Sequence, residues 1–266
     1  MGYLFKLLYN EFLKTVRDPQ RILNLVKKRR LHDYVWALRS SLKYMASWSD
    51  IGPKQIVSEG YDRIAEQYTE WARGVHKEKR AKYTAVLLEE LPAGADVLEL
   101  GCGSGTPTTR ELAKHFVVTG VDISARHVAL ARKNVPAAKF IHADMMNLDF
   151  PPYSFDAVAA FYTIIHVPRL EQPKLLKDIS SWLRTGGLFV ATMGASSAEV
   201  VFREDWLGVP MYWSTFDSET NRRLVEEAGL HIISAQEETE EVFGRLVTFL
   251  WVTAQKPIQP PEESEG

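Results

Sequence analysis

Apolar residues in the first ninety positions recur every three or four residues, which is the spacing of one face of a helix. Asp18-Pro19 interrupts this pattern where a proline would end a helix, and the Ile-Gly-Pro at 51–53 predicts a linker. Helices are expected over residues 3–16, 20–30, 35–45, 61–72 and 77–91.

The pattern changes near residue 95, where strand-like apolar runs begin to alternate with helical stretches. Strands are expected at 96–100, 116–121, 139–143, 155–161 and 187–193, and helices near 108–115, 125–134 and 170–184. This alternation predicts a parallel sheet wound with crossover helices. A loop-rich insertion is expected at 195–216, followed by a helix at 218–228.

Two further strand-like runs, 230–237 and 245–254, are separated by only seven residues. So short a gap has no room for a crossover helix, so an antiparallel hairpin is expected. The chain is thus divided into a helical N-terminal extension or lid (1–57), an α/β domain (58–256) and a disordered tail (257–266).

Composition is that of a soluble globular protein, with 45% hydrophobic and 25% charged residues. The single cysteine, Cys102, excludes an internal disulfide and a cysteine-based metal cluster, so we expect no metal and a reducing, cytoplasmic location. No uncharged apolar run approaches the roughly 18 residues that span a bilayer.

Charge is distributed unevenly, because residues 1–50 carry ten Lys and Arg against four Asp and Glu. This basic helical segment leaves three interpretations open: a lid over an acceptor pocket, a dimerisation element, or a surface that contacts anionic membrane. Nucleic-acid binding is not expected, because no aromatic platform accompanies the basic run at 27–30. The protein is expected to be a monomer or a homodimer.

The segment VLELGCGSGTPT at 97–108 places three glycines after a predicted strand and before a predicted helix. Such a loop presents backbone N–H groups at the carboxyl end of a parallel sheet, where open α/β folds bind ligands. The spacing is GxGxG and not the dinucleotide GxGxxG. Glu99, two residues before the first glycine, would repel a pyrophosphate and favour a cationic ligand.

Two more predicted strands end in carboxylates, Asp122 and Asp144. Parallel strand ends share one edge of a sheet, so both should lie beside the glycine loop. Asp122 is placed to accept hydrogen bonds from both ribose hydroxyls, and Asp144 with Met145 is placed to hold an amino-purine ring. The combination favours an adenosyl ligand that carries positive charge.

Five segments in this order, VLELGCGSGT, VDIS, HADMMNLDF, FDAVAAFYTIIHV and WLRTGGLFVATM, resemble the motifs of class I S-adenosylmethionine-dependent methyltransferases. The resemblance covers residues 58–255. It implies S-adenosylmethionine as cofactor. It also implies a Rossmann-like, doubly wound, seven-stranded sheet of order 3-2-1-4-5-7-6, with the last strand antiparallel.

The resemblance also implies roles for particular residues. Glu99 and the three glycines would surround the methionine part of S-adenosylmethionine, and Tyr61 or Tyr68 would close over this cofactor. The implied cofactor-binding residues are Tyr61, Tyr68, Glu99, Gly101, Gly103, Gly105, Asp122, Ile123, Asp144, Met145 and Phe161.

Methyl transfer is an in-line displacement that mainly requires the acceptor to be positioned and water excluded. His166 is the candidate base, and the alternative interpretation is that it is a hydrogen-bonded structural histidine. Tyr162 is a candidate for a hydroxyl that positions the acceptor. The apolar insertion leaves two interpretations, a packed lid or, as the favoured one, a wall for a small, largely apolar acceptor. The candidate wall residues are Trp206, Met211, Tyr212 and Trp213.

The expected reaction is methylation of an oxygen, nitrogen or carbon atom of a small metabolite. Two alternatives stay open: a lipid or membrane-associated substrate reached through the basic N-terminal helices, and a non-methylating adenosyl-binding protein of the same fold. The GxGxG spacing disfavours a nicotinamide-dependent oxidoreductase.

Overall fold

The computed structural model describes residues 51–258. Residues 57–258 are the described part of one compact unit, and residues 51–56 belong to the unit before it. The expected helices within 1–50 and most of the expected tail lie outside the described residues. No helix in the described range is both long and apolar enough to cross a membrane.

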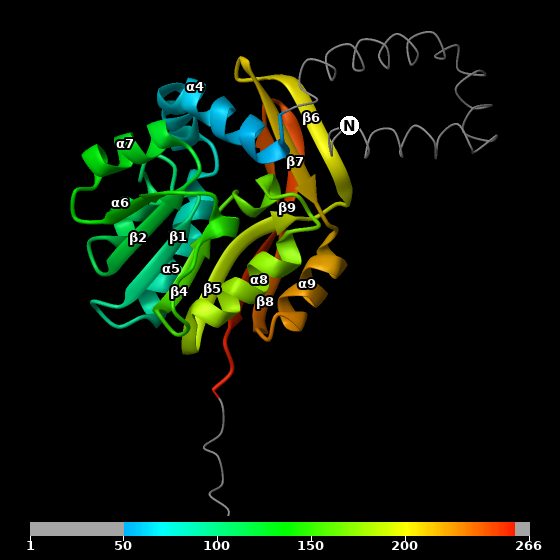
Figure 1. The fold of residues 1–266 in the computed structure, drawn as a ribbon. Coiled ribbons are helices and arrows are strands. Elements are labelled where there is room, and N and C mark those ends of the chain that lie inside the picture. Colours follow the sequence, from blue (N-terminus) through cyan, green and yellow to red (C-terminus); the bar gives the residue numbers. More distant parts are fainter. Residues whose placement is uncertain (1–50, 259–266) are drawn as a thin grey trace, which may run out of the picture. The chain divides into compact units, whose positions relative to one another are not determined.

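A seven-stranded sheet forms the centre of the described unit (Figure 1). Its strands in spatial order are β3 (Lys139–His142), β2 (Val117–Asp122), β1 (Asp96–Leu100), β4 (Phe155–Ala160), β5 (Leu183–Gly194), β9 (Arg245–Gln255) and β8 (His231–Val242). Numbered as strands of this sheet, the order is 3-2-1-4-5-7-6, which confirms the expected topology. β9 is antiparallel to both of its neighbours, also as expected.

Helices cover both faces of this sheet. Successive side chains of a strand point to opposite faces of the sheet, so each strand contacts both helix layers. Leu98 and Leu100 of β1 pack with α8 and α9, whereas Val97 packs with α5 and α6. The helices are α5 (Lys77–Glu90), α6 (Thr108–Leu112), α7 (Ala125–Asn134), α8 (Gln172–Trp182) and α9 (Ser218–Glu227).

The hairpin of β8 and β9 turns through only Phe243 and Gly244, so the seven-residue gap expected from the sequence is shorter in the structure. β8 continues to Val242 through the run 237–241, which is rich in glutamate and lies at the sheet edge. An edge strand can be polar along much of its length because few of its side chains need a core contact. Apolar alternation alone therefore ends the predicted strand too early.

The insertion at 195–216, expected to be rich in loops, is a second, two-stranded sheet. β6 (Ala198–Trp206) pairs antiparallel with β7 (Val209–Thr215), and Leu207 and Gly208 form the turn with positive φ angles of 55° and 87°. Apolar and aromatic side chains along β7 are buried, which explains why this segment is ordered as strands.

α4 (Pro53–Gly74) begins eight residues before the helix expected at 61–72. Its Gly60 lies directly against β7: a Cβ built there would be 2.9 Å from the Pro210 carbonyl oxygen and 3.0 Å from Met211 Cε. The missing side chain therefore allows α4 to approach the β6–β7 sheet closely.

Gly60→Ala should destabilise the protein by about 1 to 3 kcal/mol, because the added methyl meets a backbone oxygen. Gly74→Ala is the matched control in the same helix, since nothing lies within 4 Å of its Cβ position. It should be neutral or stabilising by up to about 1 kcal/mol, through helix propensity. Urea unfolding of both variants checks this, and equal midpoints would contradict the close packing of α4.

Candidate functional site

The carboxyl ends of β1, β2, β3 and β4 meet at one edge of the sheet. Leu100 pairs with Val121, and Asp122 pairs with His142. The glycine loop is fixed to β2, because the Gly101 and Cys102 N–H groups donate to the Val121 carbonyl at 2.8 and 3.0 Å. The sheet thus brings Asp122 beside the glycine loop, as the sequence predicts, and Asp144 follows the neighbouring strand β3.

The three glycines of the loop serve different purposes, although all have positive φ angles. A Cβ at Gly101 would lie 2.2 Å from Thr163 Oγ1, and one at Gly105 would lie 3.3 Å from Ala131 of α7. Both positions therefore permit close packing within the protein. Gly103 has open space where its Cβ would be, so this is the part of the loop that a ligand can approach.

Asp122 is 7% exposed and binds the loop directly. Its Oδ2 accepts from the Gly103 N–H at 2.8 Å and its Oδ1 from the Ser124 N–H at 2.9 Å. Burial opposes ionisation, but His127 and these two N–H groups outweigh it and lower the pKa of Asp122. The carboxylate therefore stays charged at neutral pH, as a ribose-binding group must.

Glu99 of β1 is 3% exposed and accepts a hydrogen bond from the Thr109 hydroxyl at the start of α6. Burial raises the pKa of Glu99 to about 7, although Thr109 and Arg80 act in the opposite direction. A nearby cation would favour its carboxylate form, so Glu99 can respond to a positively charged ligand.

Asp144 and Met145 follow β3 by two and three residues. Asp144 Oδ1 accepts from the Met146 N–H at 2.9 Å and caps the short 3-10 helix η1 (Met145–Asn147), and Met145 packs partly buried against the core. The Ile123 carbonyl accepts from Ser58 Oγ at 2.9 Å. These residues lie at the expected edge of the sheet, and their contacts to a cofactor remain predictions.

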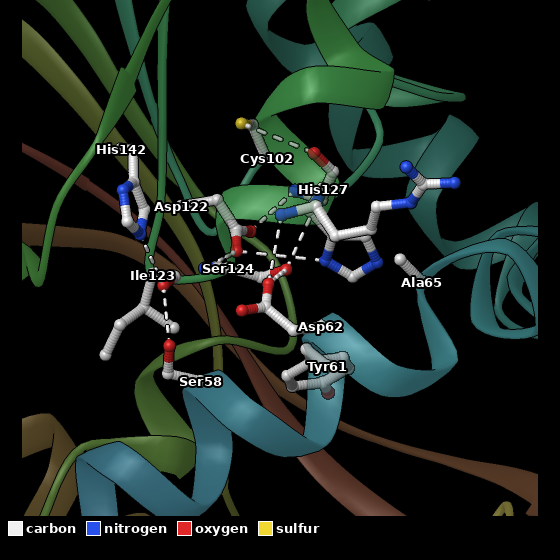
Figure 2. A network of polar contacts seen from close by, with 12 residues as sticks. Ser58, Tyr61, Asp62, Ala65, Cys102, Asp122, Ile123, Ser124, His127 and His142 are labelled. Carbon is white, nitrogen blue, oxygen red and sulfur yellow. Dashed lines mark hydrogen bonds and ion pairs between the residues drawn. The ribbon is translucent and has the colours of Figure 1, made fainter.

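α4 is fastened over this edge by polar contacts with the β2–α7 connection (Figure 2). Asp62 accepts from Ser124 Oγ at 2.6 Å and from the Arg126 N–H at 3.0 Å, and Glu66 pairs with the Arg126 guanidinium. Neither carboxylate is among the site residues expected from the sequence, although their separation by four residues puts them on one face of the helix and was a usable signal.

A cavity of about 230 Å³ is lined by aromatic side chains and by Tyr162, Ile165 and His166, which follow β4, whereas no residue of the glycine loop lines it. The Tyr61 ring connects the two regions: its centroid lies 5.4 Å from that of His127, beside Asp122, and 5.4 Å from that of His166 in the cavity wall. The aromatic residues that line the cavity include Tyr61, Tyr68, Trp71, Trp206, Trp213 and Phe249.

Not every predicted wall residue lines this cavity. Trp206 and Trp213 do, whereas Met211 and Tyr212 are buried in the packing of β7. Phe161 is 3% exposed and its ring packs 5.4 Å from that of Trp251 in the core. Contacts of these residues with a cofactor or acceptor remain predictions.

His166 lies in the short 3-10 helix η2 (Ile164–His166), immediately after β4. Its Nδ1 is 2.8 Å from the Tyr212 carbonyl oxygen, which can only accept, so Nδ1 carries the hydrogen. Nε2 is therefore the acceptor for the Tyr61 hydroxyl at 2.9 Å. Burial lowers the pKa of His166 to about 4, so the imidazole is neutral at pH 7.

Tyr162 also lines the cavity, with its backbone at a positive φ of 58°. Its hydroxyl donates to Glu240 Oε1 at 2.9 Å, and its ring stacks on that of His76 with centroids 4.0 Å apart. Burial and the charge of Glu240 raise the pKa of Tyr162, so its hydroxyl is a donor and not a base.

The edge of the sheet fits an adenosyl cofactor on three observations. There is open space above Gly103, and Asp122 is a charged acceptor. His127 Nε2, next to Asp122, is buried without a hydrogen-bond partner among the described residues. Within the same residues, no group of three His, Cys, Asp or Glu side chains is arranged to hold a metal ion.

Comparisons with known proteins point to one family. A family profile described as a methyltransferase domain matches residues 97–187. An uncharacterized methyltransferase of Geobacillus kaustophilus is 30% identical over 188 residues, which cover 69% of this chain and 77% of that protein. The 27-O-demethylrifamycin SV methyltransferase of Amycolatopsis mediterranei is 30% identical over 49% of this chain and 55% of its own length. The chain thus spans about half the length of that curated relative.

The fold is also found among solved structures. The 1,6-didemethyltoxoflavin-N1-methyltransferase of Burkholderia thailandensis, solved with 1,6-didemethyltoxoflavin and S-adenosylhomocysteine, superposes with a TM-score of 0.56. The match covers 85% of this chain and 90% of that protein at 20% sequence identity. At this identity the likeness establishes the fold.

Asp122→Ala should weaken binding of S-adenosylmethionine at least about tenfold, because the ribose loses a charged acceptor and the Gly103 N–H loses its partner. Asp96→Ala is the control, since Asp96 pairs with Arg184 at the opposite end of β1 and should leave the affinity unchanged. Calorimetry measures both. Equal affinities for S-adenosylmethionine in the two variants would remove Asp122 from the cofactor site.

Glu99→Gln should change how stability depends on pH. The folded state holds the Glu99 proton up to about pH 7, whereas the unfolded chain releases it near pH 4.5, so ionisation favours unfolding between these values. From pH 5 to pH 8 the wild type should lose on the order of 2 to 3 kcal/mol of unfolding free energy relative to Glu99→Gln. Because His166 has the opposite pH dependence in both proteins, only the difference between their urea unfolding curves is diagnostic.

Proposed function

Because the chain belongs to the class I S-adenosylmethionine-dependent methyltransferases, we propose that it methylates an oxygen, nitrogen or carbon atom of a small, largely apolar metabolite. The observation that carries this proposal is that Tyr61 lies between the aromatic cavity and the surroundings of Asp122, the carboxylate that binds the glycine loop. Its ring packs near that of His127, beside Asp122, and its hydroxyl binds His166 in the cavity wall.

Electrostatic effects on two pKa values support the proximity of Asp122 to the cavity. Burial, Tyr68 and the charge of Asp122 together raise the pKa of Tyr61. The charge of Asp122 also opposes the effect of burial on the pKa of His166. The carboxylate proposed to hold the cofactor therefore lies close enough to act on two groups of the cavity.

Gly103, Asp122 and Glu99 would hold the cofactor, with Asp144 and Met145 beside its base. When bound, S-adenosylmethionine supplies a methyl group on a positively charged sulfur atom, which becomes a neutral thioether as an acceptor lone pair displaces it. The protein contributes a desolvated, aromatic enclosure that positions the acceptor and excludes water. Glu99 and Asp122 favour the positive charge before transfer.

His166 is suited to orienting Tyr61 and is weak as a general base. A base is most effective when its pKa lies near the working pH, and burial lowers the pKa of His166 to about 4. Its accepting Nε2 is already bound to the Tyr61 hydroxyl. We therefore assign the Tyr61–His166 pair to positioning of the acceptor in the cavity, with any acceptor proton released to solvent.

Methyl transfer can be tested with methyl-labelled S-adenosylmethionine and a panel of aromatic hydroxy, amino and enol compounds. His166→Ala and Tyr61→Phe should each lower kcat about 10- to 100-fold, with affinity for the cofactor unchanged, because each removes the same hydrogen bond. His115→Ala, an exposed histidine beyond α6, is the control.

Label appearing in product in step with S-adenosylhomocysteine supports the proposed reaction. Full kcat in both the His166 and Tyr61 variants would reduce the pair to a structural role. Cofactor binding without label transfer to any compound of the panel would favour a non-methylating adenosyl-binding protein.

A further inference from the structure

Two arginines line the aromatic cavity and have no partner among residues 51–258. Arg203 lies on β6 and Arg245 at the start of β9, so two different hairpins deliver them. Within residues 51–258, neither guanidinium makes a hydrogen bond or an ion pair. Both side chains are exposed, so their charges are available to a ligand in the cavity.

Strand geometry directs these side chains to the cavity. Val201 and Arg203 are two residues apart on β6, and both line it, as does Trp213, the partner of Val201 on β7. On β9 the alternate residues Arg245, Val247 and Phe249 line it in the same way. Side chains two apart on a strand share one face, so each arginine continues an apolar, cavity-lining row.

The cavity wall carries no balancing negative charge. None of the residues that line it in the described part of the chain is an aspartate or a glutamate. Glu240 does not line the cavity, but it accepts from the Tyr162 hydroxyl and lies 2.7 Å from His76 Nδ1, so its charge is engaged by two lining residues. Two arginines thus add positive charge to an enclosure of mostly aromatic and aliphatic side chains, and His166 is neutral.

We propose that the acceptor is an anion: a planar, apolar body with a carboxylate or a phosphate that Arg203 and Arg245 bind. Aromatic walls alone would suit a cationic ligand as well, through cation–π contacts, but two unpaired guanidinium groups disfavour one. Arginine binds both oxyanions through paired N–H donors, so the chemistry shared by the two is the recognised feature. This inference rests on the proposed methyltransferase function and names the class of its acceptor.

Binding of matched naphthalene probes tests the inference. 2-Naphthoate, 2-naphthyl phosphate and the neutral 2-naphthamide share one apolar body, and calorimetry on protein saturated with S-adenosylhomocysteine measures each. The wild type should bind at least one anion about tenfold more tightly than the amide. Whichever anion binds more tightly distinguishes carboxylate from phosphate recognition.

Arg203→Gln and Arg245→Gln should each reduce the preference for the anion about three- to fivefold, and the double variant should abolish it, while affinity for 2-naphthamide stays unchanged. Arg223→Gln is the control, because Arg223 lies on α9 in an exposed pair with Glu227 and does not line the cavity. Raising the salt concentration should weaken anion binding in the wild type and leave the double variant unaffected.

Equal affinity for acid and amide in the wild type, binding of none of the three probes, or an undiminished preference in the double variant would overturn the inference. Calorimetry with S-adenosylmethionine on the same proteins separates this failure from failure of the proposed function. If the cofactor binds and the anion preference is missing, only the acceptor class is wrong. If the wild type does not bind the cofactor, the methyltransferase proposal itself fails.

Discussion

The carboxylate of Asp122 organises the candidate site, because it joins the glycine loop to the end of β2 and to the start of α7. It accepts hydrogen bonds from the N–H groups of Gly103 and Ser124, and Ser124 in turn binds Asp62 of α4. One buried charge thus fixes the loop that a cofactor would approach and the segment that holds the covering helix. His127 and the N–H donors stabilise the charge and lower the pKa of Asp122, so it remains ionised despite its burial.

The buried groups Glu99, Asp122 and His166 have pKa values that are shifted in different ways. Glu99 has one hydroxyl donor, and its pKa rises to about 7. Asp122 has two backbone donors and a neighbouring histidine, and its pKa falls. His166 loses hydration of its charged form, and its pKa falls to about 4. Because all three groups are buried, the partners of the charged form, more than depth alone, decide which of them is ionised.

The cavity is assembled from segments that lie far apart in the chain. Tyr61 and Trp71 come from α4, Trp206 from the β6–β7 sheet, and Phe249 from β9. Gly60 allows α4 to approach β7, and the Tyr212 carbonyl fixes the tautomer of His166. An aromatic enclosure with two arginines that pair with no residue in the described part of the chain therefore depends on how one helix and two hairpins pack around the same sheet edge.

The sequence by itself was sufficient for the parallel winding, the final antiparallel hairpin and the meeting of Asp122 with the glycine loop, because hydrophobic alternation and short connections leave few other arrangements. The full sheet order came from the resemblance of its motifs to those of class I methyltransferases. Only the tertiary structure decided which glycine faces open space, that 195–216 forms strands, and that β8 extends through a polar edge. It also decided that Arg203 and Arg245 share a cavity while Phe161 and Met211 are packed away from it. These features depend on contacts between segments that lie far apart in the chain. The local sequence pattern does not determine which distant side chain packs at a given position.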